Sequence, residues 1–142
     1  RAFYFRELAE RVISLTKEQA LVSGAECIYI EKSDDILLYA DEGQITQILI
    51  NLVKNAIQAE ARHIEITAEI NLSEHVIINV TNDGSPISKE SQEEIFVPFY
   101  TTKQEGTGIG LSLSRQIMRL HNGTLNLTRS DRNGTVFTLL FK

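Results

Sequence analysis

The sequence predicts an α/β domain, a two-layer sandwich in which about three helices cover one face of a mixed sheet. Three stretches with apolar residues at helical spacing are interleaved with short segments of alternating or β-branched apolar residues. The chain has 142 residues, of which 42% are hydrophobic and 23% charged. That length and balance fit one globular domain that buries a substantial core.

The first half of the chain predicts two helices and four strands. Apolar spacing predicts a helix over 5–21, and Asp41 is a favourable N-cap for a second helix ending near Ala61. Gln44, three residues after Asp41, can complete a capping box. Strands are expected at 25–30, 36–40, 63–70 and 75–81, with a turn at 32–35 between the first two.

The second half predicts an irregular stretch, one helix and a hairpin. Residues 82–107 are rich in Gly, Ser, Pro and Thr, with a helical turn near 90–96. A helix then begins near Ile109 and ends at Asn122, where we expect Gly123 to supply a left-handed C-cap. Strands at 124–128 and 135–141, joined by a turn at 131–134, close the chain.

Composition excludes several classes of protein. The formal net charge is −5 and no basic stripe is present, which argues against a nucleic-acid partner. The one cysteine, Cys27, excludes an internal disulfide framework and a cysteine-rich zinc site. No apolar run approaches the roughly 18 residues that span a bilayer, and Arg1 to Phe5 is unlike a signal peptide, so we expect a cytoplasmic domain.

The helix after Asp41 carries an unusual uncharged polar stripe. Its amides share one face at spacings of three or four residues: Gln47, Asn51, Asn55 and Gln58. Each Asn inside a helix costs roughly 0.5 kcal/mol relative to Ala, so a merely solvated face more often carries Lys and Glu. Amide oxygens are ligands suited to Mg²⁺ that also contacts substrate phosphates.

A glycine-rich loop precedes the last helix. Gly106, Gly108 and Gly110 let the backbone approach a ligand closely, and the helix N-terminus that follows offers free N–H groups. This pattern predicts a phosphate cradle, although a flexible connector is the alternative. It is neither a Walker A loop nor a dinucleotide-binding fingerprint, because the spacing and the preceding segment differ.

Two further segments are ambiguous when taken alone. Residues 80–87 form a strand followed by Asn, Asp, Gly and Pro, which is also the composition of an ordinary turn. Residues 94–103 hold aromatic side chains that could form a small core cluster, while Lys103 could reach a phosphate.

The order of these four segments resembles the ATP-binding catalytic domain of the sensor histidine kinases. That family belongs to a superfamily with DNA gyrase, the Hsp90 chaperones and the MutL repair proteins, and its members have a Bergerat-type fold. The resemblance covers the chain from about Phe5 to Phe141 and includes the closing segments 120–123 and 133–137.

The resemblance implies roles for individual residues. Asn55 would coordinate Mg²⁺ beside Asn51, Asn82 would recognise adenine, and Thr135 could support the base through water. Phe96 and Phe99 would anchor a lid over the nucleotide. The complete expected ATP-binding set is Asn51, Asn55, Gln58, Asn82, Gly84, Ile87, Thr101, Thr102, Lys103, Gly106, Thr107, Gly108, Ile109, Gly110, Leu111 and Thr135.

Two residues depart from the wider pattern. Asn82 stands where the family usually has an aspartate, but an amide carries both a donor and an acceptor, so we expect adenine recognition to survive. Asn51 stands where hydrolytic relatives have a glutamate that activates water. Since Asn cannot act as a general base at neutral pH, we expect weak ATP hydrolysis.

The resemblance also implies an incomplete enzyme. We interpret His63, His75 and His121 as structural or surface residues, and we expect the phospho-acceptor histidine before Arg1, on a helical dimerisation domain of a homodimeric protein. Residues 1–22 would then be a lead-in helix and 23–142 the ATP-binding domain, monomeric alone, with a response regulator downstream. The alternatives are a degenerate nucleotide-binding module, a hydrolytic ATPase or serine kinase of the same superfamily, and a plain interaction domain.

Overall fold

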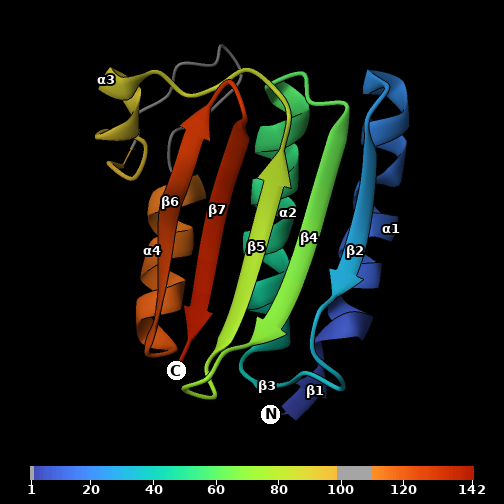
Figure 1. The fold of residues 1–142 in the computed structure, drawn as a ribbon, viewed down its shortest axis with the longest axis vertical. Coiled ribbons are helices and arrows are strands. Elements are labelled where there is room, and N and C mark those ends of the chain that lie inside the picture. The colour runs from blue at the N-terminus through green and yellow to red at the C-terminus, as the bar shows by residue number, and fades with distance from the viewer. Residues whose placement is uncertain (1, 99–109) are drawn as a thin grey trace.

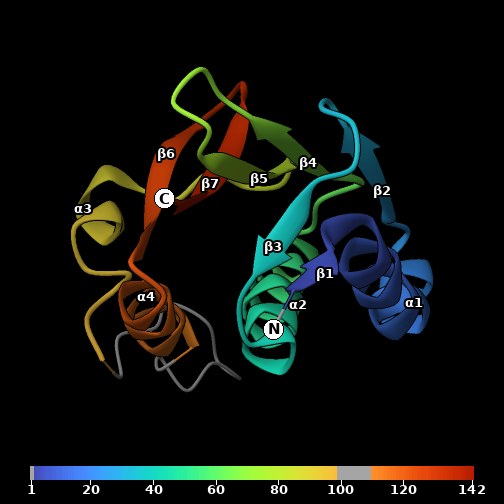
Figure 2. The ribbon, with the colours of Figure 1, turned by 90° about the horizontal axis from the view of Figure 1, so that it is seen from below.

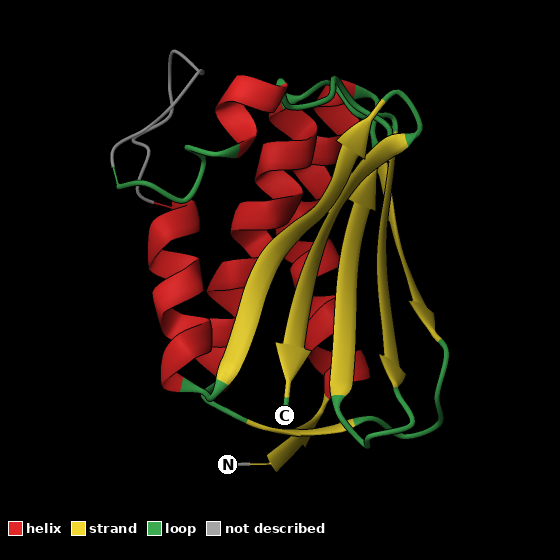
Figure 3. Ribbon diagram, turned by 60° about the vertical axis from the view of Figure 1, so that its left-hand side comes forward, coloured by secondary structure: helices red, strands yellow, loops and turns green. Residues whose placement is uncertain are grey.

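A computed structural model describes residues 2–98 and 110–142, which form two layers, one of strands and one of helices (Figure 3). The elements in chain order are β1 (Ala2–Tyr4), α1 (Phe5–Ser23), β2 (Glu26–Glu31), β3 (Leu37–Tyr39), α2 (Glu42–Gln58), β4 (His63–Ile70), β5 (Val76–Asn82), α3 (Lys89–Gln92), α4 (Gly110–Leu120), β6 (Gly123–Asp131) and β7 (Gly134–Phe141).

The main sheet has five strands in the order β2-β4-β5-β7-β6 (Figure 1). β2 runs parallel to β4 and every other neighbouring pair is antiparallel, so the predicted mixed sheet is confirmed. β5 and β7 are paired along their whole length, and their register places Asn82 opposite Thr135. The end of β5 therefore meets the start of β7 at one edge of the molecule.

The helices α1, α2 and α4 lie on the same face of this sheet, as predicted, and the short α3 lies beside β6 (Figure 2). The core lies between the layers, because alternate strand residues point toward the helices. Its largest fully buried side chains are Phe5, Leu8, Ile36, Ile45, Ile48, Leu49, Leu52, Ile64, Ile66, Ile78, Met118 and Leu125. α1 contributes Phe5 and Leu8 to this common core, while the division of the chain at residue 22 stays a prediction.

α2 begins with the predicted N-cap at Asp41, but the capping box is incomplete. The Asp41 carboxylate accepts a hydrogen bond from the Gln44 N–H at 3.0 Å. The second half of the expected capping box is wrong, because the Asp41 N–H donates to Nε2 of His121, 3.1 Å away. Nδ1 of His121 lies 2.8 Å from the Ile117 carbonyl oxygen, so the neutral ring joins the end of α4 to the start of α2. α2 ends at Gln58, earlier than expected.

The strands near the N-terminus pair in a way the sequence did not indicate. Residues 2–4 form β1, which was not predicted, and it pairs with β3 in a separate two-stranded sheet. β2 and β3 are strands, but the turn between them does not make them a hairpin, since β2 pairs with β4.

The end of α4 also corrects a prediction. Asn122, with φ of 59°, adopts the left-handed conformation expected of Gly123. Gly123 is required for a different reason: a Cβ at this position would overlap the Leu140 carbonyl oxygen and lie 2.9 Å from Cε of Met118. The glycine therefore allows β6 to start directly against α4 and β7.

Across residues 2–98 and 110–142, no helix combines the length and apolar character needed to cross a membrane.

Candidate nucleotide-binding site

A cavity of about 380 Å³ lies between the two layers where β5 ends and β7 begins. Its walls come from the last turns of α2, the segment after β5, the first turn of α4 and the start of β7. A volume in this range is ordinary for a small-molecule site.

Six of the residues predicted for ATP binding line this cavity: Asn55, Gln58, Asn82, Ile87, Leu111 and Thr135. The structure thus brings together residues that are far apart in the sequence, from Asn55 to Thr135. Other lining residues were not assigned to the site from the sequence: Ala59, Ser85, Pro86, Ser88, Ser91, Ile95 and Phe137. Seven of these thirteen lining residues are polar and six are apolar, so the cavity wall is of mixed character.

Asn82, the last residue of β5, lines the cavity and is buried, with 7% of its surface exposed. Its Oδ1 accepts a hydrogen bond from the Gly84 N–H at 2.8 Å. Gly84 itself lies against the end of α2, where a Cβ would come within 2.6 Å of the Ala59 carbonyl oxygen. The Ser85 N–H donates to that same oxygen at 2.8 Å. Gly84 therefore holds the turn against α2 and orients the Asn82 amide.

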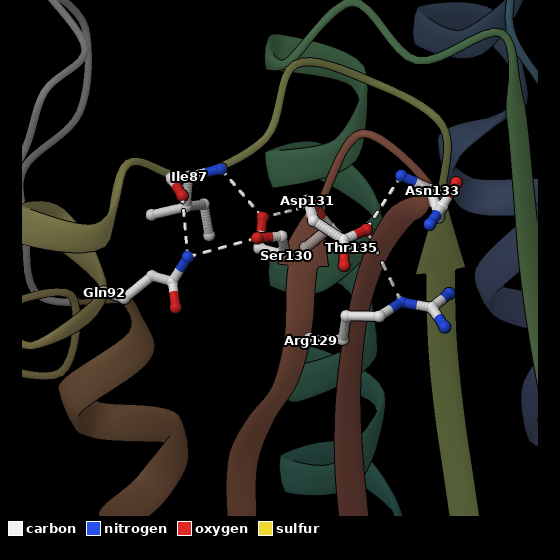
Figure 4. A network of polar contacts seen from close by, with 7 residues as sticks. All are labelled: Ile87, Gln92, Arg129, Ser130, Asp131, Asn133 and Thr135. Atoms are coloured by element: carbon white, nitrogen blue, oxygen red, sulfur yellow. Dashed lines mark hydrogen bonds and ion pairs between the residues drawn. The ribbon is translucent and has the colours of Figure 1, made fainter.

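A polar network fastens the next part of this segment to β6 (Figure 4). The Ile87 N–H donates to Oγ of Ser130 at 2.7 Å, and Oγ of Ser130 lies 2.7 Å from Oγ1 of Thr135. Nε2 of Gln92 donates to the carbonyl oxygens of Ile87, at 2.8 Å, and Ser130, at 3.2 Å. Ile87 and Thr135, which both line the cavity, are thereby joined through the hydroxyl group of Ser130. Neither Ser130 nor Gln92 was predicted, since their importance depends on contacts distant in sequence.

The amide stripe of α2 divides into two parts. Asn55 and Gln58 line the cavity. Asn51 instead lies against α4: its Oδ1 accepts from Nε2 of Gln47 at 3.1 Å, and its Nδ2 lies 3.5 Å from Oγ of Ser114. A Cβ on Gly110 would be 3.5 Å from Asn51 Nδ2, so Asn51 lies next to the start of α4. Asn51 thus lies outside the cavity lining, at its α4 side.

Most of the residues predicted for the lid and for the glycine-rich loop fall outside the described residues. These are Phe99, Thr101, Thr102, Lys103, Gly106, Thr107, Gly108 and Ile109. Gly110 and Leu111 are described and form the first turn of α4.

Phe96, one of the aromatic residues in 94–103, packs in a cluster with Arg115 and with the cavity-lining residue Phe137. The guanidinium of Arg115 lies 3.7 Å from the ring centre of Phe96, and that ring meets Phe137 edge-on with 6.4 Å between centres. Arg115 also donates to the Leu125 carbonyl oxygen at 3.0 Å and to Oδ1 of Asn126 at 2.8 Å. Arg115 therefore ties α4, β6 and the segment before residue 99 together behind the cavity wall.

Asp83, the neighbour of Asn82, serves the fold instead of the cavity. Its carboxylate accepts from the backbone N–H groups of His63, at 2.9 Å, and Arg62, at 2.8 Å, and from Nδ1 of His63 at 2.8 Å. These hydrogen bonds, led by those from His63, lower the pKa of the Asp83 carboxyl group to about 2. Asp83 fastens the end of β5 to the start of β4.

Comparison with known proteins places this arrangement in a family. Residues 40–142 match the family described as histidine kinase-, DNA gyrase B-, and HSP90-like ATPase. The chain belongs to that family. The matched region contains the whole cavity lining, and the fold predicted by the resemblance is confirmed by solved structures of the same kind.

Two curated relatives illustrate the relationship. Sporulation kinase C of Bacillus subtilis (strain 168) is 32% identical over 139 residues, which is 94% of this chain and 32% of that protein. Sensor histidine kinase ZraS of Escherichia coli (strain K12) is 40% identical over 104 residues, which is 72% of this chain and 22% of that protein. The chain thus spans a third or less of the length of these relatives.

Solved structures of histidine kinases have the same fold as this chain. The catalytic domain of histidine kinase ThkA superposes with a TM-score of 0.88 at 36% identity, covering 99% of this chain and 93% of that one. Full-length ShkA in complex with AMPPNP matches with a TM-score of 0.86 at 25% identity, over 99% of this chain and 30% of that one. ThkA in complex with the response regulator TrrA matches with a TM-score of 0.82 at 34% identity, over 99% of this chain and 41% of that one. This chain is accordingly an ATP-binding catalytic domain of the histidine kinase type, which supports the kinase interpretation over the alternatives.

Proposed function

We propose that this domain binds Mg-ATP in the cavity and presents the γ-phosphate to a histidine on a helical domain of the same, longer protein. The observation that carries the proposal is the convergence of Asn55, Gln58, Asn82 and Thr135 on one cavity within a family of ATP-binding domains. In this proposal the base lies against Asn82 and Thr135, between the apolar side chains of Ile87, Leu111 and Phe137.

Asn55 is the residue we assign to magnesium. The described part of the chain has no group of three or more His, Cys, Asp or Glu side chains that could hold a metal ion. A magnesium ion in this cavity would therefore need the nucleotide phosphates as ligands beside an amide oxygen, a combination typical of Mg²⁺. Asn55 lies on the cavity wall contributed by α2, where its oxygen would supply that ligand.

Asn51 accounts for transfer in preference to hydrolysis. Its amide hydrogen-bonds with Gln47 and Ser114 and cannot accept a proton from water at neutral pH. The γ-phosphate would then await a nucleophile from outside the domain. A neutral imidazole can attack the phosphorus, displacing ADP and forming a bond between nitrogen and phosphorus.

The proposed partners follow from this chemistry. They are the helical phospho-acceptor domain, expected before residue 1, and a response regulator that takes the phosphoryl group from the histidine. The ThkA complex with its response regulator supports the second partner by analogy. We further propose that residues 1–22 join the two domains, that the isolated domain is monomeric and that the whole protein is a homodimer in a two-component system.

Phosphoryl transfer between separate domains tests the proposal. The domain is mixed with γ-labelled ATP, Mg²⁺ and the helical region that precedes it in the full protein. We expect label on a histidine of that region and little phosphate release when the domain is alone. Rapid hydrolysis by the domain alone, with no label on the helical region, would instead support the hydrolytic alternative.

A further inference from the structure

The orientation of the Asn82 amide determines which hydrogen-bonding group faces the cavity. The Gly84 N–H can only donate, so the atom 2.8 Å from it must be the amide oxygen. Nδ2 is therefore directed away from Gly84. Among the residues that the structure describes, no atom accepts a hydrogen bond from Nδ2, although Asn82 is more than nine-tenths buried and lines the cavity.

Exchanging the two amide atoms would be unfavourable. It would place Nδ2 against the Gly84 N–H, donor against donor, and leave that backbone group unsatisfied in a partly buried turn. The turn cannot move away easily, because the N–H of Ser85, next to Gly84, donates a hydrogen bond to the Ala59 carbonyl oxygen at 2.8 Å. The hydrogen-bonding group that Asn82 offers to a ligand is thus a donor, Nδ2. We call the part of the cavity wall formed by Asn82 and Thr135 the cavity floor.

Thr135 lies beside this donor on the neighbouring strand, opposite Asn82 in the register of β5 and β7. Its hydroxyl is buried and lies 2.7 Å from Oγ of Ser130, which already accepts from the Ile87 N–H. A hydroxyl can both donate and accept. The cavity floor therefore offers a fixed donor, Nδ2 of Asn82, next to the Thr135 hydroxyl, which can donate or accept. Neither group carries a charge.

Such a floor fits two kinds of purine. With adenine, Nδ2 would donate to N1 while the 6-amino group donates to Thr135. With a 6-oxopurine, Nδ2 would donate to O6 while the N1–H donates to Thr135. A carboxylate at position 82 would behave differently, since it accepts only and would repel O6.

We infer that Asn82 makes the base site tolerant, so that 6-amino and 6-oxo purine nucleotides bind with similar affinity. This inference rests on the proposed function, because it concerns the base end of the same nucleotide. Asn82 acts here as a specificity-determining residue through the polarity of its amide.

Calorimetric titration with the imido analogues of ATP and of inosine triphosphate, both with Mg²⁺, tests the inference, because the two differ only at this edge of the base. We expect the two dissociation constants of the unaltered protein to agree within about tenfold. N82D should raise the preference for adenine by at least about tenfold, which is the size of one hydrogen bond to an ionised acceptor. The titrations are run at pH 8, because burial raises the pKa of a carboxyl group.

N79D is the matched control. Asn79 lies on the same strand, but its Oδ1 accepts from Oγ1 of Thr138 at 2.6 Å, on the face away from the helices. A carboxylate there can accept the same bond, so the preference between the two nucleotides should not change. T135V provides a second variant should N82D fail to fold: it should weaken both nucleotides by similar factors.

The outcomes separate the inference from the function. A preference of more than about tenfold for the adenine analogue in the unaltered protein overturns the inference, as does an unchanged preference in N82D or a loss confined to one nucleotide in T135V. Each of these outcomes leaves ATP binding by the unaltered protein intact, and with it the proposed function. Failure of both nucleotides to bind would contradict the proposed function and the inference together.

Discussion

At the scale of single residues, the two asparagines of α2 have different surroundings although they are one turn apart. Asn55 lies on the cavity wall, whereas Asn51 is turned toward Gln47 and Ser114. Helical spacing placed both residues on one face of α2. It could not show that α4 would pack against Asn51 and leave Asn55 at the cavity. Their proposed roles, one toward a metal and one toward α4, follow from this difference.

Asn55→Ala tests the proposed magnesium ligand. We expect the substitution to remove most of the gain in nucleotide affinity that Mg²⁺ produces, because the amide oxygen is lost. Calorimetric titration with and without Mg²⁺ measures that gain. Gln44→Ala, which removes an exposed amide from the same helix, should leave it unchanged. Equal magnesium dependence in Asn55→Ala and the parent protein would show that the ion is held elsewhere.

Gly84→Ala tests the close approach between the turn and α2. The added methyl would come within 2.6 Å of the Ala59 carbonyl oxygen, so the turn must shift and the unfolding free energy should fall by about 1–3 kcal/mol. Chemical denaturation measures the change. Gly43→Ala is the control, since a methyl there would lie at an ordinary distance of 3.5 Å from Oδ1 of Asp41, and it should be neutral or stabilising by up to about 1 kcal/mol. A Gly84→Ala protein as stable as the parent would mean that the turn adapts freely.

At the scale of elements, the cavity wall depends on how α4 is attached to β6. Arg115 supplies that attachment with two hydrogen bonds and the ring of Phe96. Since Phe96 contacts Phe137 on the cavity wall, a loose α4 would also loosen the base pocket.

Arg115→Met should therefore affect both stability and binding. The cation–π contact and the hydrogen bond to a buried carbonyl predict a loss of about 1–2 kcal/mol in unfolding free energy, together with a weaker affinity for nucleotide. Arg119→Met removes an exposed charge one turn later on α4 and should change neither quantity appreciably. Thermal unfolding and titration with the ATP analogue measure both. A destabilised Arg115→Met protein that binds nucleotide with full affinity would limit Arg115 to a structural role.

The junction of β4 and β5 should respond to acid through Asp83. Its pKa, about 2 in the folded protein, lies below the ordinary 3.8, so the carboxylate stabilises the fold above pH 4 and loses that contribution as the pH falls toward 2. We expect Asp83→Asn to be less stable than the parent protein at pH 6 by at most about 1 kcal/mol, because the group is half exposed. The difference should shrink by pH 2.5, as urea denaturation at both pH values would show. Asp34→Asn, in the exposed turn before β3, is the control; a difference independent of pH would exclude the carboxylate charge as the cause.

At the scale of the whole molecule, local sequence patterns predicted where helices and strands form better than they predicted which strands pair with each other. The alternation in 63–70 and the cap at Asp41 depend on neighbouring residues, and both elements formed where expected. The pairing of β1 with β3 and of β2 with β4 joins segments that are more than 30 residues apart in the sequence, and no local pattern encodes it.

The same distinction applies to the site. Asn82 and Thr135 could be predicted as site residues because they stand at positions of family motifs, although Asn82 replaces the usual aspartate, and the structure brings them together on one cavity. Ser130 and Arg115 lie in segments of ordinary composition, and they matter only because folding brings Ile87 next to β6 and Phe96 next to α4. The sequence also could not show why a glycine is needed at position 123. Gly123 was expected to adopt a left-handed conformation, but the packing requires it because there is no room for a Cβ.

Thermal unfolding with a non-hydrolysable ATP analogue, in the presence and absence of Mg²⁺, is the first test of whether this cavity binds Mg-ATP. At a hundred times its dissociation constant the analogue should raise the unfolding free energy by about 2.7 kcal/mol. We expect a rise in the unfolding temperature that grows when Mg²⁺ is added. No rise at millimolar analogue, with or without the metal, would contradict the assignment of this cavity to Mg-ATP.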